Sequence, residues 1–144
     1  MTPDRPAGAA EQLLYRYQAS ICVAAVYHDA GFAVVLEDVI LGELAVRFLE
    51  LVPWPEIHFV MLTPSLEEVA KREQGRPKAA YGPAWSVQTL ATVLERDTPA
   101  FGWWLDSSEL TPEQTADHIF TDTRASRIRV RDVLSRVNPV RFAT

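Results

Sequence analysis

The order of residues predicts an α/β fold in which a parallel sheet is flanked by helices. Three continuous apolar runs, at 32–36, 57–62 and 101–105, are separated by segments with helical spacing of apolar residues. Strands that are buried on both faces in parallel sheets have such continuous apolar runs. Alternation of strand and helix is typical of parallel sheets joined by helical crossovers.

Five segments between and around these runs carry helical signals. Gly31 follows the first expected helix, where a helix end favours a left-handed residue, and Pro53 stops the second. Ser65 and Glu68 form a capping box, as do Thr111 and Gln114, and the latter pair encloses a proline at the first helical position. We therefore expect helices at 9–30, 41–51 and 65–74, a fourth that begins at Ser86, and a fifth that begins at Thr111.

Composition and charge exclude several function classes. The 144 residues are 48% hydrophobic and 23% charged, which is ordinary for one globular domain, and no apolar run is long enough to span a membrane. One cysteine excludes an internal disulfide and a cysteine cluster for zinc. The N-terminus has no signal-peptide core, so we expect a cytoplasmic protein. A net charge of −5 argues against general nucleic-acid binding.

Charge is unevenly distributed along the chain. Residues 1–120 carry 17 acids and 8 bases, whereas residues 121–144 carry 6 arginines and 2 aspartates. We interpret 1–120 as the folded domain and 121–144 as a basic tail. This tail could be an arm for an acidic partner or nucleic acid, or a disordered terminus.

Polar residues follow each apolar run: Glu37-Asp38, Thr63-Pro64-Ser65 and Asp106-Ser107-Ser108. In open α/β sheets, ligands bind beyond the carboxyl ends of the strands. The sequence therefore predicts a ligand site built from these three turns.

The chain from Phe32 to Phe120 resembles P-loop small-molecule kinases related to chloramphenicol phosphotransferase. The resemblance is carried by VVLEDVILG at 34–42, FVMLTPSLEEVAKRE at 59–73, RPKAAYG at 76–82 and DTPAFGWWLDSSELTPEQTADHI at 97–119. It implies a P-loop NTPase-like sheet, and ATP- and Mg²⁺-dependent transfer of a phosphoryl group to a hydroxyl of a small-molecule acceptor.

The sequence lacks the phosphate-binding loop that this resemblance calls for. None of its six glycines begins a GxxxxGK[ST] motif, whose amides, lysine and hydroxyl hold the phosphates and magnesium. The resemblance implies that the strand bearing this loop lies centrally, between 32–36 and 57–62. We therefore expect an incomplete sheet of three recognisable strands, inactive alone, and hypothesise a mis-started gene model or a decayed gene.

Asp38 is the candidate metal ligand. It closes the first apolar run, and the resemblance implies an acid near Mg²⁺, a cation that prefers oxygen ligands. The alternative is an aspartate that ends a strand or caps the next helix.

Arg72, Arg76 and Lys78 are the candidate catalytic residues. The resemblance implies a lid that closes over ATP, in which these cations would stabilise charge on the transferred phosphoryl group. The alternative is a solvated basic helix end, which the helix dipole favours.

Asp106 and Ser107 are the candidate cofactor-binding residues, because the resemblance implies that this turn lies beside the adenine. The alternative is a turn ahead of the next helix. For the whole chain, the alternative to a kinase is a non-catalytic remnant that binds a partner through an exposed sheet edge or the basic tail.

Overall fold

The structure is a computed structural model that describes residues 6–74 and 86–137. Its described part is a mixed α/β fold with seven helices and four short strands. The helices are α1 (Pro6–Asp29), α2 (Glu43–Leu51), α3 (Leu66–Gln74), α4 (Val87–Asp97), α5 (Pro112–Thr121), α6 (Thr123–Ser126) and α7 (Val130–Val137). The strands are β1 (Glu56–His58), β2 (Val60–Leu62), β3 (Trp103–Leu105) and β4 (Arg127–Arg129).

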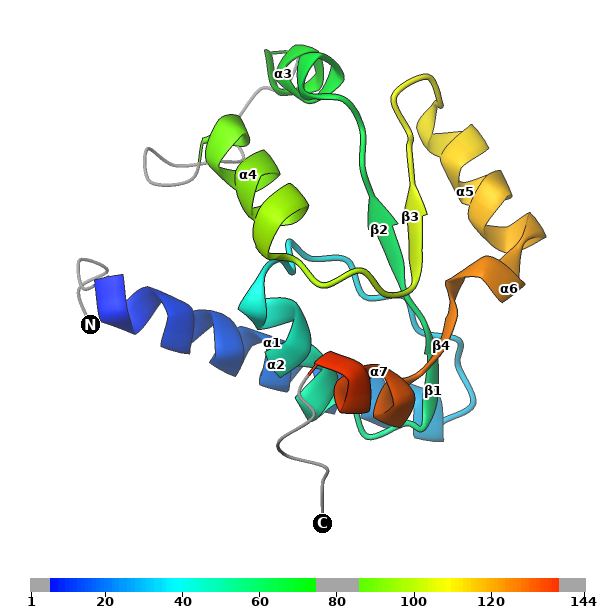
Figure 1. Cartoon of the computed structure of the whole chain (residues 1–144). Coiled ribbons are helices and arrows are strands. Elements are labelled where there is room, and N and C mark those ends of the chain that lie inside the picture. Colours follow the sequence, from blue (N-terminus) through cyan, green and yellow to red (C-terminus); the bar gives the residue numbers. More distant parts are fainter. Residues whose placement is uncertain (1–5, 75–85, 138–144) are drawn as a thin grey trace.

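The four strands form two small sheets of opposite type. β2 and β3 pair in parallel, with Met61 opposite Trp104, so the expected parallel sheet is found for residues 60–62 of the 57–62 run and for 103–105. β1 and β4 pair antiparallel, with Ile57 opposite Ile128. Figure 1 shows β2 and β3 between α3 and α4 on one side and α5 on the other, while α1, α2 and α7 lie around the second sheet.

The expected strand at 32–36 is wrong. Residues 32–40 form no strand with any described residue, and Val35 is 85% exposed. An apolar run becomes a strand only when a neighbour accepts its backbone hydrogen bonds, and the described chain provides none here. The three-strand parallel sheet is thus reduced to one parallel pair.

The expected separate tail is also replaced by folded structure as far as residue 137. Residues 127–129 form β4 and residues 130–137 form α7, whose Val133 is 2% exposed. Residues 138–144 lie outside the described part. The alternation of Arg127, Ile128 and Arg129 places the isoleucine in the core and the arginines outside, as a strand with one buried face requires.

Helix starts follow local rules. Thr111 and Gln114 form the predicted capping box before Pro112. The Ser86 hydroxyl accepts the Thr89 amide at 3.1 Å, and the Ser65 hydroxyl accepts the Glu68 amide at 3.3 Å. These contacts satisfy amides that have no partner within the helix.

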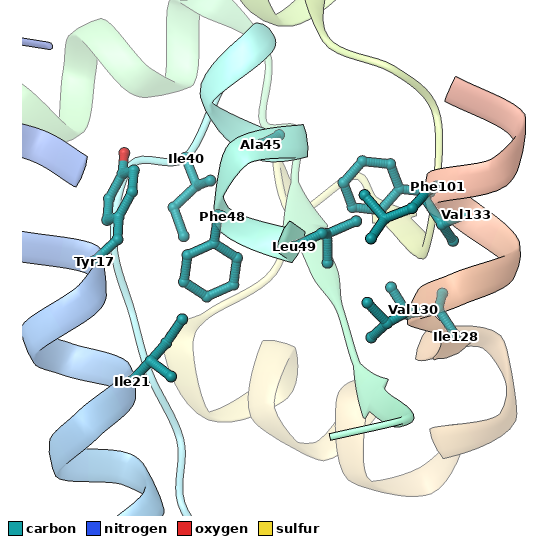
Figure 2. Close-up of a cluster of buried hydrophobic side chains, with 11 residues drawn as sticks. Tyr17, Ile21, Ile40, Ala45, Phe48, Leu49, Phe101, Ile128, Val130 and Val133 are labelled. Atoms are coloured by element: carbon teal, nitrogen blue, oxygen red, sulfur yellow. The ribbon is translucent and has the colours of Figure 1, made fainter. Parts of the chain in front are cut away.

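The core lies between α1, α2 and α7, away from β2 and β3. Figure 2 shows Tyr17 and Ile21 of α1 facing Phe48 of α2, with Val130 and Val133 beside Leu49. Tyr17 and Phe48 meet edge to face at 5.7 Å between ring centroids. By contrast, neither α3 nor α4 contributes a buried residue among those described.

Gly102 permits the close approach of β3 to the end of β1. Its φ is +70°, and an added Cβ would lie 2.5 Å from the Phe59 carbonyl oxygen. Gly31 has a φ of +88°, but a Cβ there would meet nothing within 4 Å. A side chain would therefore strain the backbone at both glycines, but it would overlap a neighbouring atom at Gly102 alone of these two.

We expect Gly102→Ala to destabilise the fold far more than Gly31→Ala. A left-handed alanine costs about 1 kcal/mol at either position, and overlap with Phe59 adds about 1–3 kcal/mol at Gly102 only. Denaturant unfolding of both variants measures the difference. Equal losses would show that the approach to Phe59 is not tight.

Glu56 joins the two ends of the antiparallel sheet. Its carboxylate accepts hydrogen bonds from the guanidinium groups of Arg127 and Arg129. The distance from Arg129 Nε to Glu56 Oε1 is 3.1 Å. Hydrogen bonds from Arg127, and next from Arg129, lower the pKa of Glu56 below the ordinary 4.5. A carboxyl group whose pKa is lowered by folding stabilises the folded state at pH values above its ordinary pKa. This stabilisation is lost as the pH falls through the lowered pKa of the folded state.

Glu56→Gln should therefore lower stability at about pH 7 and have a shrinking effect towards about pH 3. The measurement is the denaturant midpoint of both proteins across this range. Glu109→Gln, at an exposed acid with no ion pair among the described residues, is the control. A pH-independent effect of Glu56→Gln would contradict the ion-pair origin.

Candidate functional site

The carboxyl ends of the parallel strands β2 and β3 meet at one place, and polar residues follow both. Leu62 pairs with Leu105, and the Thr63 amide donates to the Leu105 carbonyl at 2.9 Å. We call the polar group beyond this point the strand-end cluster: Ser65, Arg72, Asp106, Ser107 and Ser108. Two of the three expected polar turns therefore meet here, and the first, Glu37-Asp38, follows no strand and does not join them.

Ser108 connects the two turns. Its hydroxyl accepts the Ser65 amide at 2.8 Å and donates to the Asp106 carboxylate at 2.5 Å. The Ser108 amide donates to the same carboxylate at 2.9 Å. These hydrogen bonds, the hydroxyl's first, lower the pKa of Asp106, because donors favour the charged form. The two donors of Ser108 also fix the orientation of this carboxylate.

Arg72 reaches from α3 to the turn after β3. Its guanidinium donates to the Ser107 carbonyl at 2.8 Å and to the Leu110 carbonyl at 3.4 Å. It also donates to the Glu68 carboxylate at 2.8 Å, which lowers the pKa of Glu68. A residue predicted as catalytic and a turn predicted to bind the cofactor are thus in contact, although 35 residues separate Arg72 from Ser107.

Ser107 faces the protein interior. The residue is 2% exposed, and its hydroxyl has no hydrogen-bond partner among the described residues. A hydroxyl buried in this way does not reach a ligand at the surface. Within this turn, Asp106 is the predicted cofactor-binding residue that carries an exposed polar group.

Asp38 belongs to a different part of the molecule. Its carboxylate lies 2.5 Å from the Arg16 guanidinium of α1 and accepts the Val39 amide at 2.7 Å. Among the described residues, no hydrogen bond or ion pair joins it to the strand-end cluster. The described residues contain no group of three His, Cys, Asp or Glu side chains that could hold a metal ion. The Arg16 guanidinium already neutralises the Asp38 carboxylate, and this pairing competes with a Mg²⁺ ion there.

Two other predicted site residues, Arg76 and Lys78, lie outside the described residues. The sequence reasoning missed the ion pair of Arg16 with Asp38, for which no local signal exists because 22 residues separate them. It also missed the role of Glu68. This side chain was expected to accept the Ser65 amide at the start of α3, but it accepts a hydrogen bond from Arg72 instead. The Asp-Ser-Ser order could have indicated the Asp106 turn, since aspartate often accepts the amide two residues later.

Two shallow grooves lie along α1, and neither is lined by a strand-end residue. Within the part of the chain that the structure describes, no helix is long and apolar enough to cross a membrane. Comparison with protein-family models, curated proteins and solved structures finds no match to this chain.

Arg72 should hold the turn after β3 in place. We expect Arg72→Gln to speed hydrogen exchange of the Leu110 amide, which donates to the Ser107 carbonyl at 3.3 Å. Because the lost hydrogen bonds are charge-assisted but come from a half-exposed side chain, we expect the exchange rate of this amide to rise about tenfold. Lys71→Gln is the matched control, because Lys71 is 79% exposed and contacts the same Glu68 at 3.6 Å. Equal exchange in both variants would contradict a clamping role.

Proposed function

We propose that this chain supplies the nucleotide-facing side of an ATP-dependent small-molecule phosphotransferase and does not complete the reaction alone. The observation that carries the proposal is the contact of Arg72 with the 106–108 turn at the ends of two parallel strands. Ligands of α/β proteins bind at such ends. The resemblance of residues 97–119 to P-loop kinases supports the same choice of site.

The residues present fit only part of an ATP site. The exposed Asp106 carboxylate could accept the amino or hydroxyl donors of a nucleoside, since Ser108 fixes its orientation by donating twice to one of its oxygens. The phosphates have no cradle, because the sequence holds no GxxxxGK[ST] loop. At Asp38, the ion pair of the carboxylate with Arg16 competes with Mg²⁺. No phosphoryl-transfer step is therefore assigned to this chain.

The proposed role of Arg72 requires a rearrangement. A lid arginine stabilises charge on a transferred phosphoryl group only if its donors face that group. Here its guanidinium donates to Glu68 and to backbone carbonyls of the 107–110 turn. In the described conformation, Arg72 therefore acts as a positioning residue for the turn.

Nucleotide photolabelling of residues 1–144 tests this proposal. We expect 8-azido-ATP to label the 106–110 turn weakly, saturating only near about 1 mM because the phosphates contribute little without their loop. Asp106→Ala should reduce the labelling, whereas Asp117→Ala, an exposed acid on α5, should not. Micromolar binding would contradict the disabling effect of the missing loop, and labelling elsewhere would contradict the site.

A second candidate function is non-catalytic binding of a protein partner. The observation in its favour is the exposed apolar run at 32–36, where Phe32 is 61% and Val35 85% exposed. The basic tail gives less support to this candidate, because its Arg127 and Arg129 form ion pairs with Glu56 within the chain.

A further inference from the structure

The buried residue Ser126 connects the end of α6 to the end of β1. Its hydroxyl donates to the Thr123 carbonyl at 3.1 Å and lies 3.0 Å from Nδ1 of His58. Its carbonyl accepts the Phe59 amide at 2.8 Å. Ser126 is 0% exposed, whereas His58 is an exposed residue of β1. A buried hydroxyl therefore holds one side of an exposed imidazole ring.

The hydrogen bonds of this hydroxyl determine which nitrogen of His58 carries the proton. A hydroxyl has one proton, a carbonyl can only accept, and a ring nitrogen donates or accepts according to its tautomer. Both contacts of Ser126 are hydrogen bonds only if its proton points to Thr123 and Nδ1–H of His58 donates to it. Because buried polar groups are paired in folded proteins, this count of protons assigns the Nδ1–H tautomer to the neutral ring.

The lone pair of the neutral ring is therefore on Nε2. This nitrogen makes no hydrogen bond with a described residue. An imidazole nitrogen with a free lone pair is a nucleophile, and a hydrogen bond at the other nitrogen fixes the direction in which it points. The surface of β1 thus carries an oriented nucleophile.

The face of the antiparallel sheet that carries His58 has an excess of positive charge. Arg127 is paired with His58 and Arg129 with Glu56, so these side chains share one face. The one glutamate forms ion pairs with both arginines, whose side chains are 61% and 72% exposed. Each guanidinium has five N–H donors, so donors remain for a further anion beside Nε2.

We propose that Nε2 of His58 is a phosphoryl-acceptor site, and that its substrates are donors in which phosphorus is bound to nitrogen. The Nε2 lone pair forms a bond to phosphorus while the phosphorus–nitrogen bond of the donor breaks. The donor nitrogen leaves with that electron pair, as ammonia in the case of phosphoramidate. The ring becomes an imidazolium that keeps its Nδ1 proton and its hydrogen bond to Ser126.

The charges around His58 favour this product. The transferred phosphoryl group is an anion, and Arg127 lies directly across the strand pair from the ring that receives it. Arginine donors suit phosphoryl oxygens because the planar guanidinium meets two oxygens at once. Ser126 is a positioning residue, since it acts through the ring and does not touch the phosphoryl group.

Nitrogen-15 NMR of residues 1–144 tests the tautomer. At about pH 8.5, above the range in which histidine ordinarily titrates, we expect a pyrrole-type Nδ1 and a pyridine-type Nε2 at His58. Ser126→Ala should release the ring into a mixture of tautomers, with circular dichroism to check the fold. Ser135→Ala, at a hydroxyl that donates within α7, is the matched control and should leave the His58 signals unchanged. A pyridine-type Nδ1 in the unaltered chain would overturn the proposal.

Reaction with potassium phosphoramidate tests the site itself. We expect phosphorylation of His58 at Nε2 to be at least about tenfold faster than that of His118, an exposed histidine on α5. Arg127→Gln should slow the reaction at His58 about fivefold, the effect of an exposed charge pair. Arg96→Gln, at an exposed arginine on α4, should not slow it.

Peptide mass spectrometry identifies the phosphorylated residue, and phosphorus NMR identifies the nitrogen. Equal rates at the two histidines, or attachment at Nδ1 of His58, would overturn the proposal. The inference does not rest on the phosphotransferase proposal, because His58 lies on the antiparallel sheet and not in the strand-end cluster. Labelling of the 106–110 turn by 8-azido-ATP is independent of these results, so the two proposals fail separately.

Discussion

The two sheets of this protein are joined through the backbone of one residue, Phe59. Its amide donates to the Ser126 carbonyl at 2.8 Å, and its carbonyl accepts the Trp103 amide at 3.0 Å. The chain thus changes at Phe59 from pairing with β4 to pairing with β3. The absence of a side chain at Gly102 allows this second contact. Because β3 is placed there, its carboxyl end reaches the end of β2, and the strand-end cluster depends on this junction.

The two halves on either side of Phe59 are stabilised by different interactions. Around α1, α2 and α7, buried apolar side chains such as Leu49 exclude water. Around β2 and β3, Ser108 and Arg72 join separate turns by hydrogen bonds, and no buried residue is described on α3 or α4. Polar contacts near solvent add little stability but fix geometry. The strand-end cluster therefore has burial on the side of β3, at Leu105 and Ser107, but none from α3 or α4.

Local chemistry explains which features could be predicted from sequence. The capping residue Thr111 acts within one helical turn, so its helix was predictable. The contact of Arg72 with Ser107 depends on the tertiary path, which no local pattern encodes. The apolar run at 32–36 predicts a buried strand, but the structure has none there. The composition of a segment shows that its side chains favour burial, and it does not show whether another strand lies beside it. Ile128 lies between two arginines, in the segment that the charge distribution assigns to a basic tail. The alternation of apolar and charged residues with a period of two also indicates a strand, and the structure has a strand there.

The composition of the core has a consequence for how the chain folds during synthesis. Tyr17 and Ile21 come from near one end of the described chain, and Val133 and Leu134 come from near the other. This core cannot close until the ribosome has released α7, so α1 and α2 emerge long before their last neighbours. Contacts of such separation form slowly and leave apolar surface open to chaperones or to other nascent chains.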